Sequence, residues 1–181
     1  MCSSDLSFFG SKFGRFIEEM LVSPISNQTI LLGYVTGGVA RAVSVGIIVT
    51  ILSLFFTHLA IHNILAVVSI TLLTAVLFSL LGFINGVYAK RFDDVSIVPT
   101  FVLTPLTYLG GVFFSIDLLP DFWAGIAQLN PILYVVNAFR YGILGVSDIS
   151  LGLAYGILIS MTVVAYVIAI RLLANGAGVR S

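Results

Sequence analysis

The sequence predicts an all-α, polytopic helical membrane protein that forms a single domain over residues 1–181. We expect four transmembrane helices, an amphipathic helix near the N-terminus and a re-entrant helical hairpin on the outer side of the membrane. Of the 181 residues, 59% are hydrophobic and only 9% are charged, whereas a soluble domain carries about 25% charged residues. So few charges cannot cover a surface that faces water, and most of the surface must therefore face lipid.

Four long apolar runs predict the spans, at residues 30–56, 64–88, 95–114 and 151–170. A spanning helix needs roughly 20 mainly apolar residues, because the hydrocarbon core of a bilayer is about 30 Å thick. All four runs are long enough to cross, and the first two are long enough to tilt.

Two prolines, Pro99 and Pro105, lie inside the third run. Each removes a backbone donor, so we expect the helix to bend there, with neighbouring groups satisfying the freed carbonyls. Bent helices often line a moving pathway, but purely structural kinks are as common.

Residues 117–144 are apolar but interrupted by Pro120, by the Asn130-Pro131 pair and by Gly142. Neither resulting piece is long enough to span, and short apolar pieces are typical of re-entrant or interfacial helices. A residue that precedes proline is pushed out of helical geometry. We therefore expect Asn130 to form the corner of an outer helical hairpin.

Lysine and arginine are unevenly distributed between the two sets of loops that alternating spans would create. One side carries Lys12, Arg15, Lys90, Arg91, Arg171 and Arg180. The other side carries Arg140, near Tyr134, whose ring suits an anchoring position at the outer interface. Because cytoplasmic loops carry an excess of basic residues, both termini are predicted to be cytoplasmic and the hairpin to face outward.

A helical pattern precedes the first span. Its apolar stripe consists of Phe9, Phe13, Phe16, Ile17, Met20 and Leu21. Arg15, Glu18 and Glu19 lie mostly off this stripe, and the Ser23-Pro24 pair ends the helix. The helix should lie along the cytoplasmic face. A simple interfacial anchor explains it, yet two adjacent glutamates suit a basic protein partner better than anionic lipid headgroups.

Other polar groups each have two interpretations. Arg41 lies well inside the first span, where a charge costs at least about 2.5–3.5 kcal/mol. It either faces the bundle interior, where it touches substrate or a partner helix, or extends toward the cytoplasmic interface. His58 and His62 could share a metal on a helix, but no third ligand is evident, so a polar outer loop is favoured. Asp93 and Asp94 are expected in a solvated turn.

Several classes of function are excluded by what the sequence lacks. The formal net charge is zero, so no basic surface indicates nucleic acid. The single cysteine, Cys2, excludes a disulfide within the chain. No phosphate-binding loop, H-E-x-x-H or G-x-S-x-G motif is present. We therefore expect no catalytic residue, cofactor or metal, and any ATP would be hydrolysed on another chain.

Two stretches resemble ABC-2 type export permeases. "EEMLVSPISNQTILLG" is similar to a segment in which Glu, a short apolar run and Ser-Pro or Thr-Pro precede a span. "PLTYLGGVFFSIDLLPDFWAGIAQLNPILYVVNAFRYG", residues 105–142, is similar to the family's long signature of Gly-x-Phe-Phe, Leu-Pro, Asn-Pro-Ile/Leu-x-Tyr and Arg. The resemblance covers most of the chain in order. It is nearest to bacterial inner-membrane permeases of multidrug, lipid and polysaccharide export systems.

This resemblance implies the membrane permease subunit of an ATP-driven ABC exporter, which moves a drug, lipid or glycan across the inner membrane. Family members have six spans, form homodimers or heterodimers, and bind a cytoplasmic ATPase subunit through a short helix between the second and third spans. By this template residues 7–23 form the coupling helix. Its ATPase-contacting residues would be Arg15, Glu18, Glu19, Ser23 and Pro24. The four spans would be the family's last four, and the chain would lack the first two.

A secondary carrier or a structural membrane protein is the main alternative. Carriers place ionisable groups deep in their spans for ion coupling, and here Arg41 is the one candidate. An intramembrane enzyme would need paired acids or a nucleophile with its base at membrane depth, which the sequence does not offer. Arg41, Pro99 and Pro105 are the candidate residues of a substrate pathway.

Overall fold

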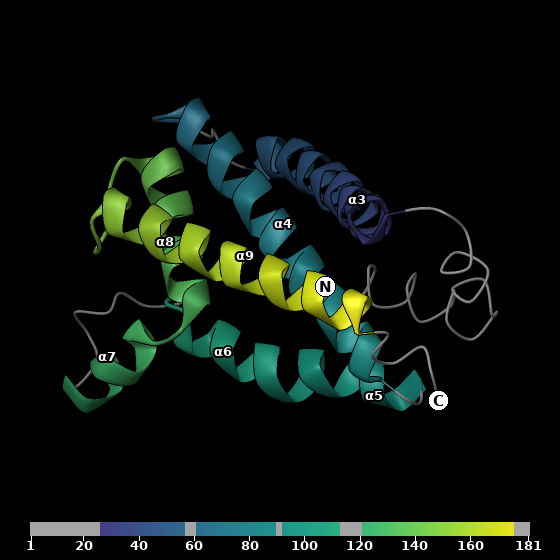
Figure 1. Cartoon of the computed structure of the whole chain (residues 1–181). Helices are drawn as coiled ribbons and strands as arrows, with labels where there is room; N and C mark the ends of the chain where they lie inside the picture. The colour runs from purple at the N-terminus through teal and green to yellow at the C-terminus, as the bar shows by residue number, and fades with distance from the viewer. Residues whose placement is uncertain (1–25, 57–60, 90–91, 113–120, 176–181) are drawn as a thin grey trace.

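A computed structural model describes residues 26–56, 61–89, 92–112 and 121–175 (Figure 1). All secondary structure in these ranges is helical, which confirms the all-α class. Three of the described helices are long and apolar enough to cross a membrane: α3 (Asn27–Phe56), α4 (Ile64–Tyr88) and α9 (Leu151–Ala174). They correspond to the first, second and fourth predicted runs, so the chain is a polytopic helical membrane protein.

The third run forms a shorter helix in three segments, which we call the segmented arm. It consists of α5 (Phe92–Ile97), the π-helical turn η1 (Val98–Leu103) and α6 (Thr104–Leu109). The helix therefore ends earlier than the predicted residue 114. The physical reason is the Gly110-Gly111 pair, because Gly111 has a φ of 73°, a left-handed conformation that terminates helices and favours glycine.

Two shorter helices lie between the arm and α9. They are α7 (Asp121–Gln128) and α8 (Pro131–Leu144). Asn130 separates them in an extended conformation, with φ −87° and ψ 117°, and its side chain accepts a hydrogen bond from the backbone N–H of Ile132. A helix break at Asn130 is therefore present, built from an N-cap asparagine and a proline in the first helical turn. The location of this helix break on the outer side of the membrane stays a prediction.

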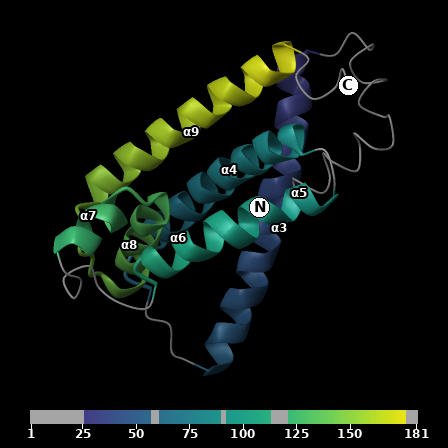
Figure 2. The same cartoon turned by 90° about the horizontal axis from the view of Figure 1, so that it is seen from below.

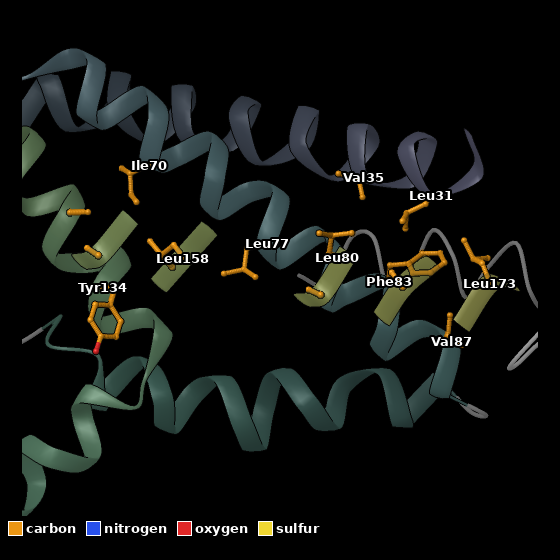
Figure 3. Packing of buried hydrophobic residues seen from close by; sticks show 14 residues of the cluster. Leu31, Val35, Ile70, Leu77, Leu80, Phe83, Val87, Tyr134, Leu158 and Leu173 are labelled. Atoms are coloured by element: carbon orange, nitrogen blue, oxygen red, sulfur yellow. The ribbon is translucent and has the colours of Figure 1, made fainter. Parts of the chain in front are cut away.

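The core lies where α4 packs against α8, α9 and the start of α3 (Figure 3). Its labelled members are Leu31, Val35, Ile70, Leu77, Leu80, Phe83, Val87, Tyr134, Leu158 and Leu173. Figure 2 shows α3 crossing the other helices at a steep angle, with its C-terminal half extending away from them. The buried residues of α3 are accordingly confined to its N-terminal part, Ile30, Leu31 and Val35. The remaining apolar surface of α3 is suited to lipid or to further helices.

Candidate functional site

The start of α4 and the end of α8 form one tightly joined unit. The backbone N–H of Asn63 donates to the Gly142 carbonyl at 2.8 Å, and that of His62 donates to the Ile143 carbonyl at 3.2 Å. A Cβ atom added at Gly142 would lie 2.6 Å from Val67 Cγ2 and 3.1 Å from the Val67 backbone nitrogen. Only glycine therefore permits the two backbones to approach so closely at this point.

His62 has a packing role in this unit. Its ring meets the Tyr141 ring edge-on, with 5.8 Å between centroids. It also lies against Gly145, which caps α8 with a φ of 74°. His58 lies outside the described residues, and within the described ranges no three His, Cys, Asp or Glu side chains cluster as a metal site would require. A structural role thus accounts for His62.

Arg140 connects three parts of the fold. Its Nη1 donates to Asp148 Oδ2 at 3.0 Å, in the loop between α8 and α9. Its Nη2 donates to the Gly111 carbonyl at 2.8 Å, just beyond the segmented arm. The two charged side chains are 21% and 18% exposed, so water screens this ion pair less than it screens a fully exposed one.

Asn137 fixes the same loop from within the core. Its side chain is 1% exposed. Asn137 Oδ1 accepts a hydrogen bond from the Asp148 backbone N–H at 3.0 Å, and its Nδ2 donates to the Leu133 carbonyl at 3.0 Å. Each end of this buried amide thus has a hydrogen-bond partner, as buried polar groups require. Asn137 could not be predicted from the sequence, because a lone asparagine in an apolar helix gives no periodic signal.

The beginning of α8 holds the end of α6. Asn130 is 6% exposed, and its Nδ2 donates to the Leu106 carbonyl at 2.5 Å. This bond satisfies one of the carbonyls that every helix leaves without an intrahelical donor at its C-terminus. A Cβ added at Gly110 would lie 2.7 Å from Ile132 Cγ2. Pro131 occupies the first turn of α8, where its missing N–H removes no helical bond.

Tyr134, predicted to lie at the outer interface, is buried within the protein. The residue is only 7% exposed and belongs to the core (Figure 3). Its hydroxyl donates to the Gln128 carbonyl at 2.7 Å, which ties α7 to α8. The aromatic ring buries apolar area while its hydroxyl finds a partner at the helix end, as a buried tyrosine requires.

Pro99 lies within the π-helical turn η1, and Pro105 lies just beyond it in α6. Pro99 has no N–H to donate to the Val95 carbonyl, and this carbonyl instead accepts a hydrogen bond from Asn85 Nδ2 of α4 at 3.2 Å. The predicted compensation by a neighbour is therefore present at Pro99. The Thr104 backbone N–H donates to the Pro99 carbonyl five residues earlier, which is the π-helical pattern. Pro105 then lies in the first turn of α6.

A cavity of about 380 Å³ lies between α3, α4 and α8. Its lining consists of Gly38, Ala42, Ile70, Thr71, Thr74, Ala75, Phe78, Ser79, Val135 and Phe139. No charged residue contributes to this lining. Arg41 precedes Ala42 in the sequence but is absent from the wall, as are Pro99 and Pro105. The three residues assigned to a pathway are therefore not brought together around this cavity.

Thr74 is unusual among the hydroxyl residues of the described helices. Thr71, for example, donates to the Val67 carbonyl one turn earlier at 2.7 Å, whereas Thr74 Oγ1 is buried without a hydrogen-bond partner. An unsatisfied buried hydroxyl costs about 1–3 kcal/mol. We expect Thr74→Val to leave stability unchanged or raise it by about 1 kcal/mol, whereas Thr71→Val should not stabilise. Thermal unfolding of both variants in detergent checks this, and a clear loss of stability in Thr74→Val would contradict it.

The remaining predicted site residues lie outside the described ranges. They are Arg15, Glu18, Glu19, Ser23, Pro24 and Pro120. The coupling helix predicted at residues 7–23 also falls there.

The helices and their packing define a class, that of multi-pass helical membrane proteins. Comparison with known proteins gives the family. The family model for the ABC-2 type transporter matches residues 1–144, and the chain belongs to this family. The resemblance inferred from the sequence motifs is thereby confirmed. No solved structure matches the chain.

Curated relatives agree with this assignment. The chain is 55% identical over 175 residues to the "Inner membrane transport permease YadH" of Escherichia coli strain K12, covering 97% of this chain and 68% of the relative. It is 30% identical over 171 residues to "Nodulation protein J" of Rhizobium leguminosarum bv. viciae, covering 91% of this chain and 64% of that protein. The protein of the same name from Rhizobium meliloti strain 1021 is 23% identical over 159 residues.

Proposed function

We propose that the chain is the membrane permease subunit of an ATP-driven ABC exporter in the cell inner membrane. The main support is the family match over residues 1–144 together with 55% identity to an inner membrane transport permease. The sequence has no phosphate-binding loop of its own. ATP would therefore be hydrolysed by a separate cytoplasmic ATPase subunit, and the permease would not itself be an enzyme.

The substrate we propose is a drug, lipid or glycan. The apolar surface of the long helices and the uncharged lining of the α3–α4–α8 cavity favour a compound with a large apolar part. The permease is proposed to work as a homodimer or heterodimer, with both termini cytoplasmic because the basic residues concentrate on that side.

Residues 7–23 are proposed as the contact with the ATPase. The apolar stripe would rest against the cytoplasmic ends of the spans. Glu18 and Glu19, with Arg15 nearby, would face a groove on the ATPase that carries basic groups.

Purification of the tagged protein from bacterial membranes tests the proposal. We expect a protein with the G-x-x-x-x-G-K-[ST] loop to co-purify, identified by mass spectrometry. A secondary carrier would have no such partner. Reproducible absence of an ATPase under conditions that preserve membrane complexes would therefore contradict the proposal. A tagged, unrelated membrane protein from the same cells serves as the control.

A further inference from the structure

We propose that the α3–α4–α8 cavity is a binding site for one hydrocarbon chain of a bilayer phospholipid. The proposal concerns binding alone, so it requires neither the ATPase nor transport. It goes beyond the lipid that surrounds any membrane protein, because the chain would lie between three helices and would remain there when the surrounding lipid is exchanged for detergent.

The cavity lies at the depth of the hydrocarbon core. Its α4 wall runs from Ile70 to Ser79. At 1.5 Å per residue, this stretch lies about 9–23 Å from the start of α4 at Ile64. A helix that crosses a hydrocarbon core about 30 Å thick places such a stretch within that core. The molecules that meet the cavity from the bilayer are therefore lipid chains, and not headgroups or water.

The cavity opens onto surface that is suited to lipid. Its α3 wall consists of Gly38 and Ala42, and Ala42 is exposed although it lines the cavity. The C-terminal half of α3, which begins here, extends away from the other helices (Figure 2), and Val45 in its next turn is 53% exposed. On the α8 side, Phe139 lines the cavity and is 39% exposed. The cavity wall is thus continuous with the apolar exterior of the long helices, and a lipid chain can enter from the bilayer.

The chemistry of the wall fits hydrocarbon. No charged side chain lines the cavity in the described part of the chain. Thr71 Oγ1 donates to the Val67 carbonyl, and Thr74 Oγ1 is buried, so these hydroxyl groups offer little to an occupant. A buried water makes about three hydrogen bonds, and a glycan would need more. The wall instead offers apolar groups such as Ile70 and Phe78.

The size of the cavity also favours an occupant. About 380 Å³ is more than twice the roughly 150 Å³ of an engineered apolar cavity that stays dry and binds benzene. An empty apolar space forfeits the dispersion contacts of its walls and destabilises the fold in proportion to its volume. A flexible lipid chain restores these contacts without desolvating a polar group. Its headgroup can stay at the interface while the chain reaches the depth of the cavity.

Photo-crosslinking tests the site. The probe is phosphatidylethanolamine with a diazirine in the middle of one acyl chain, and adducts are mapped by mass spectrometry. In nanodiscs we expect adducts on Phe78 and Phe139 of the cavity and on the exposed Val163 and Val164 of α9. After dilution of the lipid with detergent, the cavity adducts should persist and the α9 adducts should disappear. Absence of cavity adducts, or loss of both sets at the same dilution, would overturn the proposal.

A variant that fills the cavity provides the second test. Ala42→Phe places a ring in the cavity from the α3 side and should remove the cavity adducts while leaving the α9 adducts in nanodiscs unchanged. Ala40→Phe is the matched control, because Ala40 is also exposed on α3 but does not line the cavity. Cavity adducts that persist at the wild-type level in Ala42→Phe would overturn the proposal. The dilution experiment uses the unsubstituted protein, so it stands even if Ala42→Phe does not fold.

Discussion

Replacing both Glu18 and Glu19 with Lys is expected to abolish recovery of the ATPase with the permease while leaving the permease in the membrane. The two carboxylates are the only acidic residues of the amphipathic stretch at residues 7–23. If they dock a basic groove, the double substitution places like charges across the contact. Such juxtaposition costs several kcal/mol, and each 1.4 kcal/mol weakens binding about tenfold.

The measurement is the amount of ATPase that co-purifies with wild-type and double-Lys proteins at equal permease level. Glu18→Gln with Glu19→Gln is the matched control, because it removes the charges without reversing them and should give intermediate recovery. Membrane insertion should be unaffected, since the two glutamates belong to the polar face of the predicted surface helix. Equal recovery of the ATPase with all three proteins would mean that residues 7–23 form only a membrane anchor.

Gly142→Val is expected to cause the largest loss of stability in the described part of the chain, about 3 kcal/mol. The new side chain would collide with Val67, including its backbone nitrogen at 3.1 Å from the added Cβ, so a rotamer change cannot relieve the overlap. The start of α4 would have to move away from α8. That movement would also break the bond from Asn63 N–H to the Gly142 carbonyl.

Gly156→Val on α9 provides the control. It is also a helical glycine, but a Cβ there meets no described atom within 4 Å, so it should change stability by no more than the difference in helix propensity, under about 1 kcal/mol. Thermal unfolding in the same detergent compares the two variants. A midpoint for Gly142→Val that is no lower than that for Gly156→Val would contradict the close packing of α4 and α8.

Much of the fold could be predicted because a helix that crosses a bilayer needs a minimum length of apolar residues. The bounds of α4 agree with the predicted run, and the break at Asn130 follows from local backbone sterics. The early end of the arm at Leu109 was not predicted. The hydrophobic run continues past Gly110 and Gly111, and hydropathy alone does not show that Gly111 adopts a positive φ.

The candidate site was harder to predict because its contacts join segments that are distant in the sequence. The sequence identifies Arg140 as one of the few charged residues on its side of the membrane. One of its partners, however, is the backbone carbonyl of Gly111. A partner that is a backbone group cannot be recognised from the residue type. Tyr134 was expected at the outer interface from its residue type, and its burial within the protein was not predicted. Composition cannot distinguish an apolar surface that faces lipid from one that faces protein, since lipid tails are as apolar as leucine. Which aromatic residues enter the core is decided by tertiary packing.

We propose that this chain recruits a cytoplasmic ATPase to the membrane. The most direct test is membrane fractionation of cells that contain the ATPase recovered with the tagged permease, compared with and without the permease. We expect the ATPase to sediment with the membranes only when the wild-type permease is present. An ATPase that stays in the soluble fraction despite a normal permease level, or that binds membranes equally without the permease, would contradict it.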